Sequence, residues 1–235
     1  MPDSAKIVGE KSTWYLYSEV AAENINTFEP DAKCIAMVRN PVDLAHSLHS
    51  QLLKSKNSKE DICDFETAWN AQGERMKGER LPPNCPEPKM LQYGKVCKLG
   101  AQIERVLEHF PRERVFIIFY DDLKKDPKKV YENTFRFLNL PCDNRLHFPV
   151  INKNKNVSFP LLRRYAFRLA RLKERLGIKV GFGILTSFVN ATIQEKERQQ
   201  LSDDFRSELT EYFTEDVKKL SKLTGRNLSN WYSGN

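Results

Sequence analysis

Two short apolar runs dominate the pattern of hydrophobic and polar positions. Residues 33–39, KCIAMVR, and residues 115–120, VFIIFY, hold apolar side chains without alternation, which is typical of strands buried on both faces. Apolar residues at helical spacing occupy residues 61–78 and 92–110 between them. A strand, a long helical crossover and a second strand predict an α/β fold, with both strands parallel and central and helices covering both faces.

A helix is predicted directly after the first apolar run. Asn40 is a favoured N-cap, Pro41 fits the first helical position, and Asp43 suits the positive end of the helix dipole. Apolar residues continue at helical spacing to about residue 55.

Three further helices are predicted in the later part of the chain. Residues 127–138, 161–176 and 203–224 each place apolar side chains on one side. Residues 141–160, with three prolines and an Asn/Lys-rich centre, are typical of a loop. Neither an internal repeat nor a clear boundary divides the chain, so we expect a single domain over residues 1–235.

Composition favours a folded protein in a reducing compartment. Apolar residues make up 40% of the sequence and charged residues 29%, which is enough apolar material for a core. The five cysteines are scattered without a C-x-x-C pair, which argues against a disulfide framework and against structural zinc. Neither a transmembrane run nor a secretory signal is found. We expect a cytoplasmic protein, with the Golgi lumen or membrane as the alternative if an anchor precedes residue 1.

The net charge of +7 is concentrated in one stretch of the chain. Residues 153–179 carry nine Lys or Arg residues and one acidic residue. The helix predicted at 161–176 keeps its arginines largely off the apolar stripe. Three interpretations remain open: a solvated helix packed on the domain, a rim that attracts an anionic cofactor or acceptor, and a surface that adsorbs to anionic membranes.

Common catalytic signatures are absent from the sequence. It contains no G-x-x-x-x-G-K-[ST], G-x-G-x-x-G, G-x-S-x-G or H-E-x-x-H motif. His46 and His49 are three positions apart on a predicted helix, but further ligands at fitting positions are lacking. We therefore expect two partly exposed histidines and no metal site.

The segment from Arg39 to Ser47 carries the clearest chemistry. Arg39 ends a predicted strand, and Ser47 lies about two turns into the following helix. Ligands of open parallel sheets bind beyond the carboxyl ends of the strands, where a guanidinium can hold a phosphate and a hydroxyl can add a hydrogen bond. The residues alone leave two interpretations open: a phosphate site, or an arginine bonded to loop carbonyls beside a solvent-facing serine.

Several motifs follow one another between residues 7 and 231. They are GEKSTWYL at 9–16, K-x-I-x-x-x-R-N-P-x-D-x-x-x-S at 33–47, FPRERV at 110–115, YDDLKKDP at 120–127, FLNL at 137–140, and the tail from 220 to 231. In this order and spacing they resemble the sulfotransferases that use 3′-phosphoadenosine 5′-phosphosulfate (PAPS). The bacterial and Golgi-type branch, which acts on carbohydrate and other hydroxyl or amino acceptors, is the most similar.

The resemblance implies a fold and a set of site residues. The fold would be a three-layer α/β/α sandwich with a central parallel sheet, similar to P-loop nucleoside-triphosphate hydrolases but without their first strand and loop. Arg39 and Ser47 match the pair that binds the 3′-phosphate of PAPS, and Lys11 matches a catalytic lysine near the transferred sulfuryl group. Lys153 and Lys155 lie in a loop that carries cofactor contacts in relatives. The co-substrate would be PAPS, and the reaction would need no metal.

Two departures from the family pattern concern catalysis. The P-K-[SC]-G-[TS]-[TS] loop that holds the 5′-phosphosulfate is missing, and Thr13 stands where the cytosolic branch has a histidine base. A threonine cannot act as a base at neutral pH. We expect that an N-terminal portion is lacking from the sequence, the alternative being a degenerate member of the family. Residues 1–235 alone are then expected to transfer sulfuryl groups poorly and to expose a sheet edge.

Two functional hypotheses follow. The first is a sulfotransferase that moves a sulfuryl group from PAPS to a hydroxyl or amine of a small-molecule or glycan acceptor. The alternative is a non-catalytic remnant of that fold, or a basic module that binds anions or glycans. Nucleic acid is not an expected partner in either case.

Overall fold

The computed structural model describes most of the chain outside one long segment. The described residues are 7–55, 59–83, 85, 87–143, 145–149 and 200–233. The chain divides into two compact units, Met1–Phe148 with Ser202–Asn235, and Pro149–Leu201. Nearly all described residues belong to the first unit. The basic helix expected at 161–176, with Lys153 and Lys155 before it, lies outside them.

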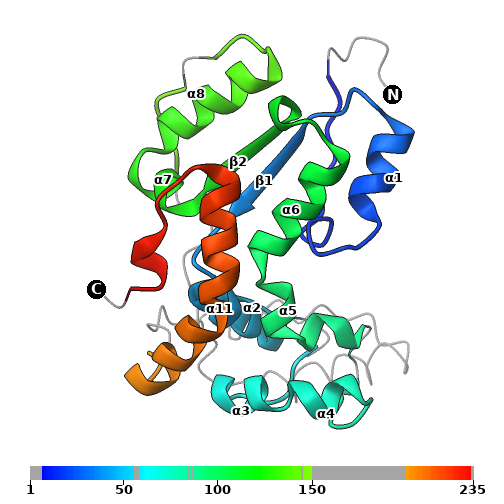
Figure 1. Ribbon diagram of the computed structural model, residues 1–235, viewed down its shortest axis with the longest axis vertical. Coiled ribbons are helices and arrows are strands. Elements are labelled where there is room, and N and C mark those ends of the chain that lie inside the picture. Colours follow the sequence, from blue (N-terminus) through cyan, green and yellow to red (C-terminus); the bar gives the residue numbers. More distant parts are fainter. Residues whose placement is uncertain are drawn as a thin grey trace, which may run out of the picture. The chain divides into compact units, whose positions relative to one another are not determined.

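The first unit combines two strands with helices that differ widely in length (Figure 1). In chain order its elements are α1 (Ala21–Phe28), β1 (Cys34–Val38), α2 (Pro41–Lys54), α3 (Phe65–Asn70), α4 (Gln72–Met76), η1 (Pro88–Leu91), α5 (Tyr93–Val96), α6 (Leu99–His109), η2 (Arg112–Arg114), β2 (Val115–Phe119), α7 (Tyr120–Lys125), α8 (Pro127–Leu138), α11 (Asp203–Thr224) and η3 (Ser229–Trp231). Within the part of the chain that is described, no helix is both long and apolar enough to cross a membrane.

The two strands pair in parallel, as their apolar runs predict. Cys34 lies opposite Val115, and the register continues to Val38 opposite Phe119. The chain between them crosses over through helices α2 to α6, because parallel neighbours cannot be joined by a tight turn. Both carboxyl ends therefore lie at the same edge of the sheet.

Helices lie on both sides of this sheet (Figure 1). On one face, Val115 and Cys34 pack in a core with Ala22 of α1 and with the end of α6. On the other face, the ring of Phe116 stacks on Phe137 of α8 with 5.3 Å between centroids. The described elements thus form the three layers that an α/β/α fold requires.

Strand β1 differs from its prediction in burial. Ala36 and Val38 are buried, but Ile35 and Met37 keep 43% and 50% of their surface exposed. Alternate residues of a strand face opposite sides, so one face of β1 is covered and the other is open. Helix α8 packs on this second face at Phe116 of β2, but Ile35 and Met37 of β1 stay partly uncovered, so the expectation of burial on both faces is wrong for β1.

The two helical patterns between the strands are each divided in the structure. Residues 61–78 form α3 and α4 with Ala71 between them, and residues 92–110 form α5 and α6. Helix α6 begins where Asp216 of α11 accepts hydrogen bonds from the backbone N–H groups of Gly100 (2.7 Å) and Ala101 (2.9 Å). This contact satisfies two of the N–H groups that a helix start leaves without partners.

Helix α11 is held against the crossover helices by aromatic side chains. Phe205 contacts Phe65 and Trp69 of α3, with ring centroids 5.7 and 6.5 Å apart, and Phe213 lies 5.8 Å from Trp69. All four rings are buried, and such pairs add to the energy of apolar burial. Their packing fixes the first turn of α11 in the same core as α3.

Candidate functional site

The parallel register brings Arg39 and Tyr120 together at the carboxyl end of the sheet. Val38 and Phe119 form the last pair of the ladder, so the residue that follows each strand leaves the sheet at the same edge. The guanidinium carbon of Arg39 lies 4.7 Å from the centre of the Tyr120 ring, within the range of a cation–π contact. Stacking orients the guanidinium and leaves its in-plane N–H groups for hydrogen bonds.

Helix α2 begins immediately after Arg39, and its first residues behave as the sequence predicts. Asn40 is the N-cap, and its side-chain oxygen accepts a hydrogen bond from the Val42 backbone N–H at 3.0 Å. Pro41 fills the first helical position, where a missing N–H costs little. The positive end of the helix dipole therefore lies beside Arg39 and adds to the positive potential there.

Asp43 stands between the two residues that the sequence assigns to a phosphate. Its Oδ2 atom lies 3.6 Å from Nη2 of Arg39, whose side chain is 27% exposed. Ser47 is half-buried and lies one turn after Asp43, and residues four apart share a helix face. Arg39 thus meets a carboxylate near the surface and is not turned into the core. Ser47 lies near the middle of α2, and its convergence with Arg39 on one anion stays a prediction.

Two cations from other elements join this group. Nη2 of Arg206, in the first turn of α11, lies 3.4 Å from Oδ1 of Asp43. Nζ of Lys124, on α7, lies 6.0 Å from the centre of the Tyr120 ring. Asp43 thus contacts two guanidinium groups, and Lys124 approaches the same Tyr120 ring that Arg39 contacts. Such an excess of positive charge attracts anions, and guanidinium groups suit phosphate in particular.

The remaining predicted site residues do not join this group in the described structure. Lys11 is exposed in the segment before α1, a segment that the Arg105 side chain of α6 tethers through two backbone carbonyl oxygens. No described contact brings Lys11 to Arg39. Lys153 and Lys155 lie outside the described residues. The roles of these three lysines stay predictions.

Sequence reasoning assigned no role in the site to Tyr120, Lys124 or Arg206. Tyr120 carries a usable signal, because it directly follows the second predicted strand and must lie at the same edge as Arg39. Arg206 carries no local signal, since 163 residues separate it from Asp43. Its place depends on how α11 packs.

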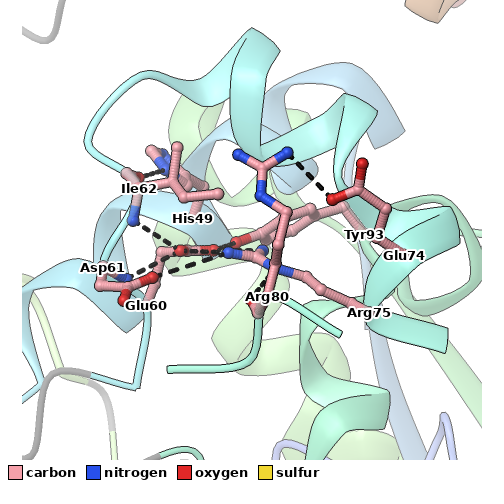
Figure 2. Close-up of polar contacts among 8 residues, drawn as sticks. All are labelled: His49, Glu60, Asp61, Ile62, Glu74, Arg75, Arg80 and Tyr93. Atoms are coloured by element: carbon pink, nitrogen blue, oxygen red, sulfur yellow. Dashed lines mark hydrogen bonds and ion pairs between the residues drawn. The ribbon is translucent and has the colours of Figure 1, made fainter. Parts of the chain in front are cut away.

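A buried polar network joins the loop after α2 to α4 and α5 (Figure 2). Glu60 and Arg75 are each 1% exposed, and two guanidinium N–H groups of Arg75 donate to the two Glu60 oxygens at 2.7 Å. The Tyr93 hydroxyl also donates to Glu60, and the backbone N–H groups of Asp61 and Ile62 donate at 2.8 Å. Charged, buried groups satisfied this fully serve to hold a structure together.

The protonation states of this network are fixed at neutral pH. Burial alone would raise the pKa of the Glu60 carboxyl, but hydrogen bonds from Arg75 and Tyr93 outweigh burial and hold that pKa below its usual range. Burial, followed by the charge of Glu60, raises the pKa of Tyr93 far above its usual range. Glu60 therefore stays charged and Tyr93 stays protonated, which suits a structural anchor better than acid–base catalysis.

His49 is buried, so the prediction of a partly exposed side chain is wrong for it. The side chain is 2% exposed, because Phe65 of α3 and Tyr93 of α5 pack against its ring at 5.1 and 5.9 Å. Its Nε2 atom lies 2.9 Å from the Ile62 carbonyl oxygen. His46 is half-buried and stacks on Phe65 at 5.3 Å. Among the described residues, no three His, Cys, Asp or Glu side chains are placed to hold a metal ion.

The fold and the site define an α/β protein with a cationic site at the carboxyl end of a parallel sheet. Residues 19–230 match the family model described as the sulfotransferase domain, a range that includes Arg39, Ser47, Tyr120 and Arg206. The chain therefore belongs to the sulfotransferase domain family, which confirms the resemblance carried by its motifs.

Two similar proteins illustrate this membership. Bifunctional heparan sulfate N-deacetylase/N-sulfotransferase 1 of Caenorhabditis briggsae is 23% identical over an alignment of 231 residues, which covers 96% of this chain and 24% of that protein. The chain thus spans about a quarter of the length of this curated relative. A solved sulfotransferase from Alicyclobacillus acidocaldarius is 24% identical, with a TM-score of 0.65 over 97% of this chain and 70% of that chain. The second likeness supports the sulfotransferase fold.

Proposed function

We propose that this protein transfers a sulfuryl group from PAPS to a hydroxyl or amine of an acceptor. The observation that carries the proposal is the position of Arg39: it leaves the carboxyl end of β1, stacks on Tyr120 and lies beside the start of α2. A dianionic phosphate bound there would meet a guanidinium, the positive end of a helix and the hydroxyl of Ser47 on that helix. Family membership over residues 19–230 supports sulfuryl transfer as the reaction.

Each proposed residue has a distinct role. Arg39 and Ser47 hold the 3′-phosphate of the donor, and Lys153 and Lys155 supply further contacts to it. Lys11 stabilises the negative charge that develops as the bond between sulfur and the donor phosphate oxygen breaks. A bond forms between sulfur and the acceptor oxygen or nitrogen, and the acceptor proton passes to a base. No base is assigned among the residues proposed for the site, because Thr13 cannot act as one near neutral pH.

A carbohydrate is the acceptor class that we favour. The curated relative from Caenorhabditis briggsae carries heparan sulfate N-sulfotransferase in its name, and a glycan offers both hydroxyl and amine groups. A non-catalytic module that binds anions or glycans is the alternative. It is favoured by the exposed side chain of Lys11, which no described contact joins to Arg39.

An acceptor-dependent transfer assay separates these functions. The 235-residue chain is incubated with PAPS and either N-deacetylated heparosan or a hydroxyl-bearing glycan, and the release of adenosine 3′,5′-bisphosphate is followed together with sulfation of the glycan. Because residues 1–235 are expected to transfer sulfuryl groups poorly, we expect slow release that depends on the acceptor and disappears in Arg39→Ala. Binding of PAPS without release favours the binding module. If the chain neither binds PAPS nor releases the bisphosphate, the proposal is wrong.

A further inference from the structure

We infer that Arg206 of α11 is a second guanidinium of the anion site at the end of β1 and that Asp43 holds it there. The inference rests on the proposed function for the identity of the anion, which is the 3′-phosphate of an adenosine nucleotide. It adds to the site a residue from the far end of the chain.

Asp43 contacts both arginines of the proposed site. Its two carboxylate oxygens each meet a different guanidinium, Oδ2 that of Arg39 at 3.6 Å and Oδ1 that of Arg206 at 3.4 Å. The Asp43 carboxylate therefore lies between the two guanidinium groups. Both distances exceed a close hydrogen bond, and all three side chains are partly exposed. The guanidinium groups are therefore oriented without being saturated, and a phosphate from solvent can reach them.

Arg206 occupies an unfavourable position on its helix. It lies in the first turn of α11, which also holds Asp203 and Asp204. A cation there is opposed by the helix dipole, which favours acidic residues at this end. Helix formation therefore does not explain an arginine at this position, whereas the contact with Asp43 does. Phe205, which is buried against Phe65 and Trp69, keeps this turn beside α2.

The positive charge around Asp43 exceeds its single negative charge. Arg39 and Arg206 share a single carboxylate, and Lys124 approaches from α7 through Tyr120. The two guanidinium groups repel each other, and Asp43, the carboxylate that both contact, balances only one of their two positive charges. An anionic phosphate bound between them would balance the other. Phosphate binds strongly to paired guanidinium groups. Binding it would give Arg206 a function beyond the small stabilisation that a surface ion pair provides.

The test compares two nucleotides that differ in one phosphate. Calorimetry measures dissociation constants of the 235-residue chain for adenosine 3′,5′-bisphosphate and for adenosine 5′-phosphate, in the wild type, Arg39→Ala and Arg206→Ala. Lys218→Ala is the matched control, because it removes one positive charge from α11 and breaks an exposed ion pair with Glu215. We expect Arg206→Ala to weaken the bisphosphate by about tenfold and the monophosphate by less than about twofold, and Lys218→Ala to change neither.

The possible outcomes separate this inference from the proposed function. If Arg39→Ala weakens the bisphosphate and Arg206→Ala behaves like Lys218→Ala, the inference is wrong and the proposed function stands. If neither arginine matters, both are wrong. Equal weakening of both nucleotides by Arg206→Ala would mean a structural disturbance and would also overturn the inference. Arg206→Gln, which keeps more of the side chain, replaces Arg206→Ala if that variant does not fold.

Discussion

Charged side chains in this protein fall into two groups that differ in exposure. Glu60 and Arg75 are buried and bind each other through two hydrogen bonds of 2.7 Å. Arg39 and Asp43 are partly exposed, and their closest nitrogen and oxygen are 3.6 Å apart, which is a looser contact. Removing one member of a buried pair leaves an uncompensated charge, while an exposed pair contributes little to stability. The first group holds the fold, and the second is open to a ligand.

Loss of the Glu60 charge should destabilise the protein strongly. Glu60→Gln removes the buried countercharge of the Arg75 guanidinium and leaves it only the partly exposed Asp61 carboxylate at 3.9 Å, and we expect the free energy of unfolding to fall by about 3 kcal/mol. Lys128→Ala is the control, because it breaks an exposed ion pair with Glu132 on α8 and should change stability by less than about 1 kcal/mol. Urea unfolding followed by circular dichroism measures both. Equal stabilities of the two variants would contradict a structural role for the network.

The same carboxylate makes stability depend on pH. Burial would raise the pKa of Glu60, but Arg75 and Tyr93 hold it below its ordinary value of 4.5 in the folded protein. A carboxyl with a lowered folded pKa stabilises the fold above the unfolded pKa and loses that effect as the pH falls through the folded pKa.

We therefore expect the stability difference between the wild type and Glu60→Gln to be constant near neutral pH. The difference should shrink as the pH falls below 4.5, the ordinary pKa of the Glu60 carboxyl. Urea titrations at a series of pH values measure this difference. A difference that persists unchanged through acid conditions would show that folding does not lower the pKa of Glu60.

The helices are ordered by tertiary contacts as much as by their own sequences. The bounds of α8 and α11 match the sequence patterns, because local caps set them: Asp126 accepts from the Lys129 N–H at 2.9 Å, and Gly225 ends α11 with φ of 67°. The break between α5 and α6 was not predictable, since the group that caps α6 is Asp216, about 115 residues further along the chain.

Close packing of α6 on α11 requires a glycine at position 100. A Cβ atom at Gly100 would lie 2.2 Å from the Asp216 backbone oxygen, so Gly100→Ala must push the two helices apart. We expect it to lower the free energy of unfolding by about 3 kcal/mol.

Gly73→Ala on α4 is the matched control for this substitution. A Cβ atom at Gly73 has nothing within 4 Å, and alanine there should raise stability by up to about 1 kcal/mol. Thermal unfolding of both variants checks the pair. Similar changes in the two would mean that α6 and α11 do not pack as closely as the structure shows.

The same distinction between local and tertiary signals applies to the candidate site. The position of Arg39 at a strand end and of Ser47 on the following helix was predictable, because a strand end, an N-cap and a helix repeat all lie in one short segment; their roles toward a phosphate stay predictions. The position of Arg206 was not predictable, because its place beside Asp43 follows from aromatic packing of Phe205 on α3. Burial of both faces of β1 was wrongly predicted, because apolar composition alone does not say which face other elements cover.

At the scale of the whole first unit, segments far apart in the sequence meet around the end of β2. Arg226 pairs with Asp122 and lies 4.1 Å from the centre of the Phe119 ring, and Nε1 of Trp231 donates to Asp121 at 3.0 Å. These contacts attach the C-terminal tail to the start of α7. They support the same edge of the sheet at which Arg39 and Tyr120 lie.

In the function that we propose, this edge of the sheet recognises a 3′-phosphate. The most direct test is calorimetric binding of adenosine 3′,5′-bisphosphate and adenosine 5′-phosphate to the wild type, Arg39→Ala and Ser47→Ala. We predict that the wild type prefers the bisphosphate. Arg39→Ala should cost about 1.5–3 kcal/mol of that binding, because a charge-assisted contact is lost, and Ser47→Ala about 1 kcal/mol, because a neutral hydroxyl is lost. Equal affinity of the wild type for both nucleotides, or unchanged bisphosphate binding in Arg39→Ala, would contradict the account.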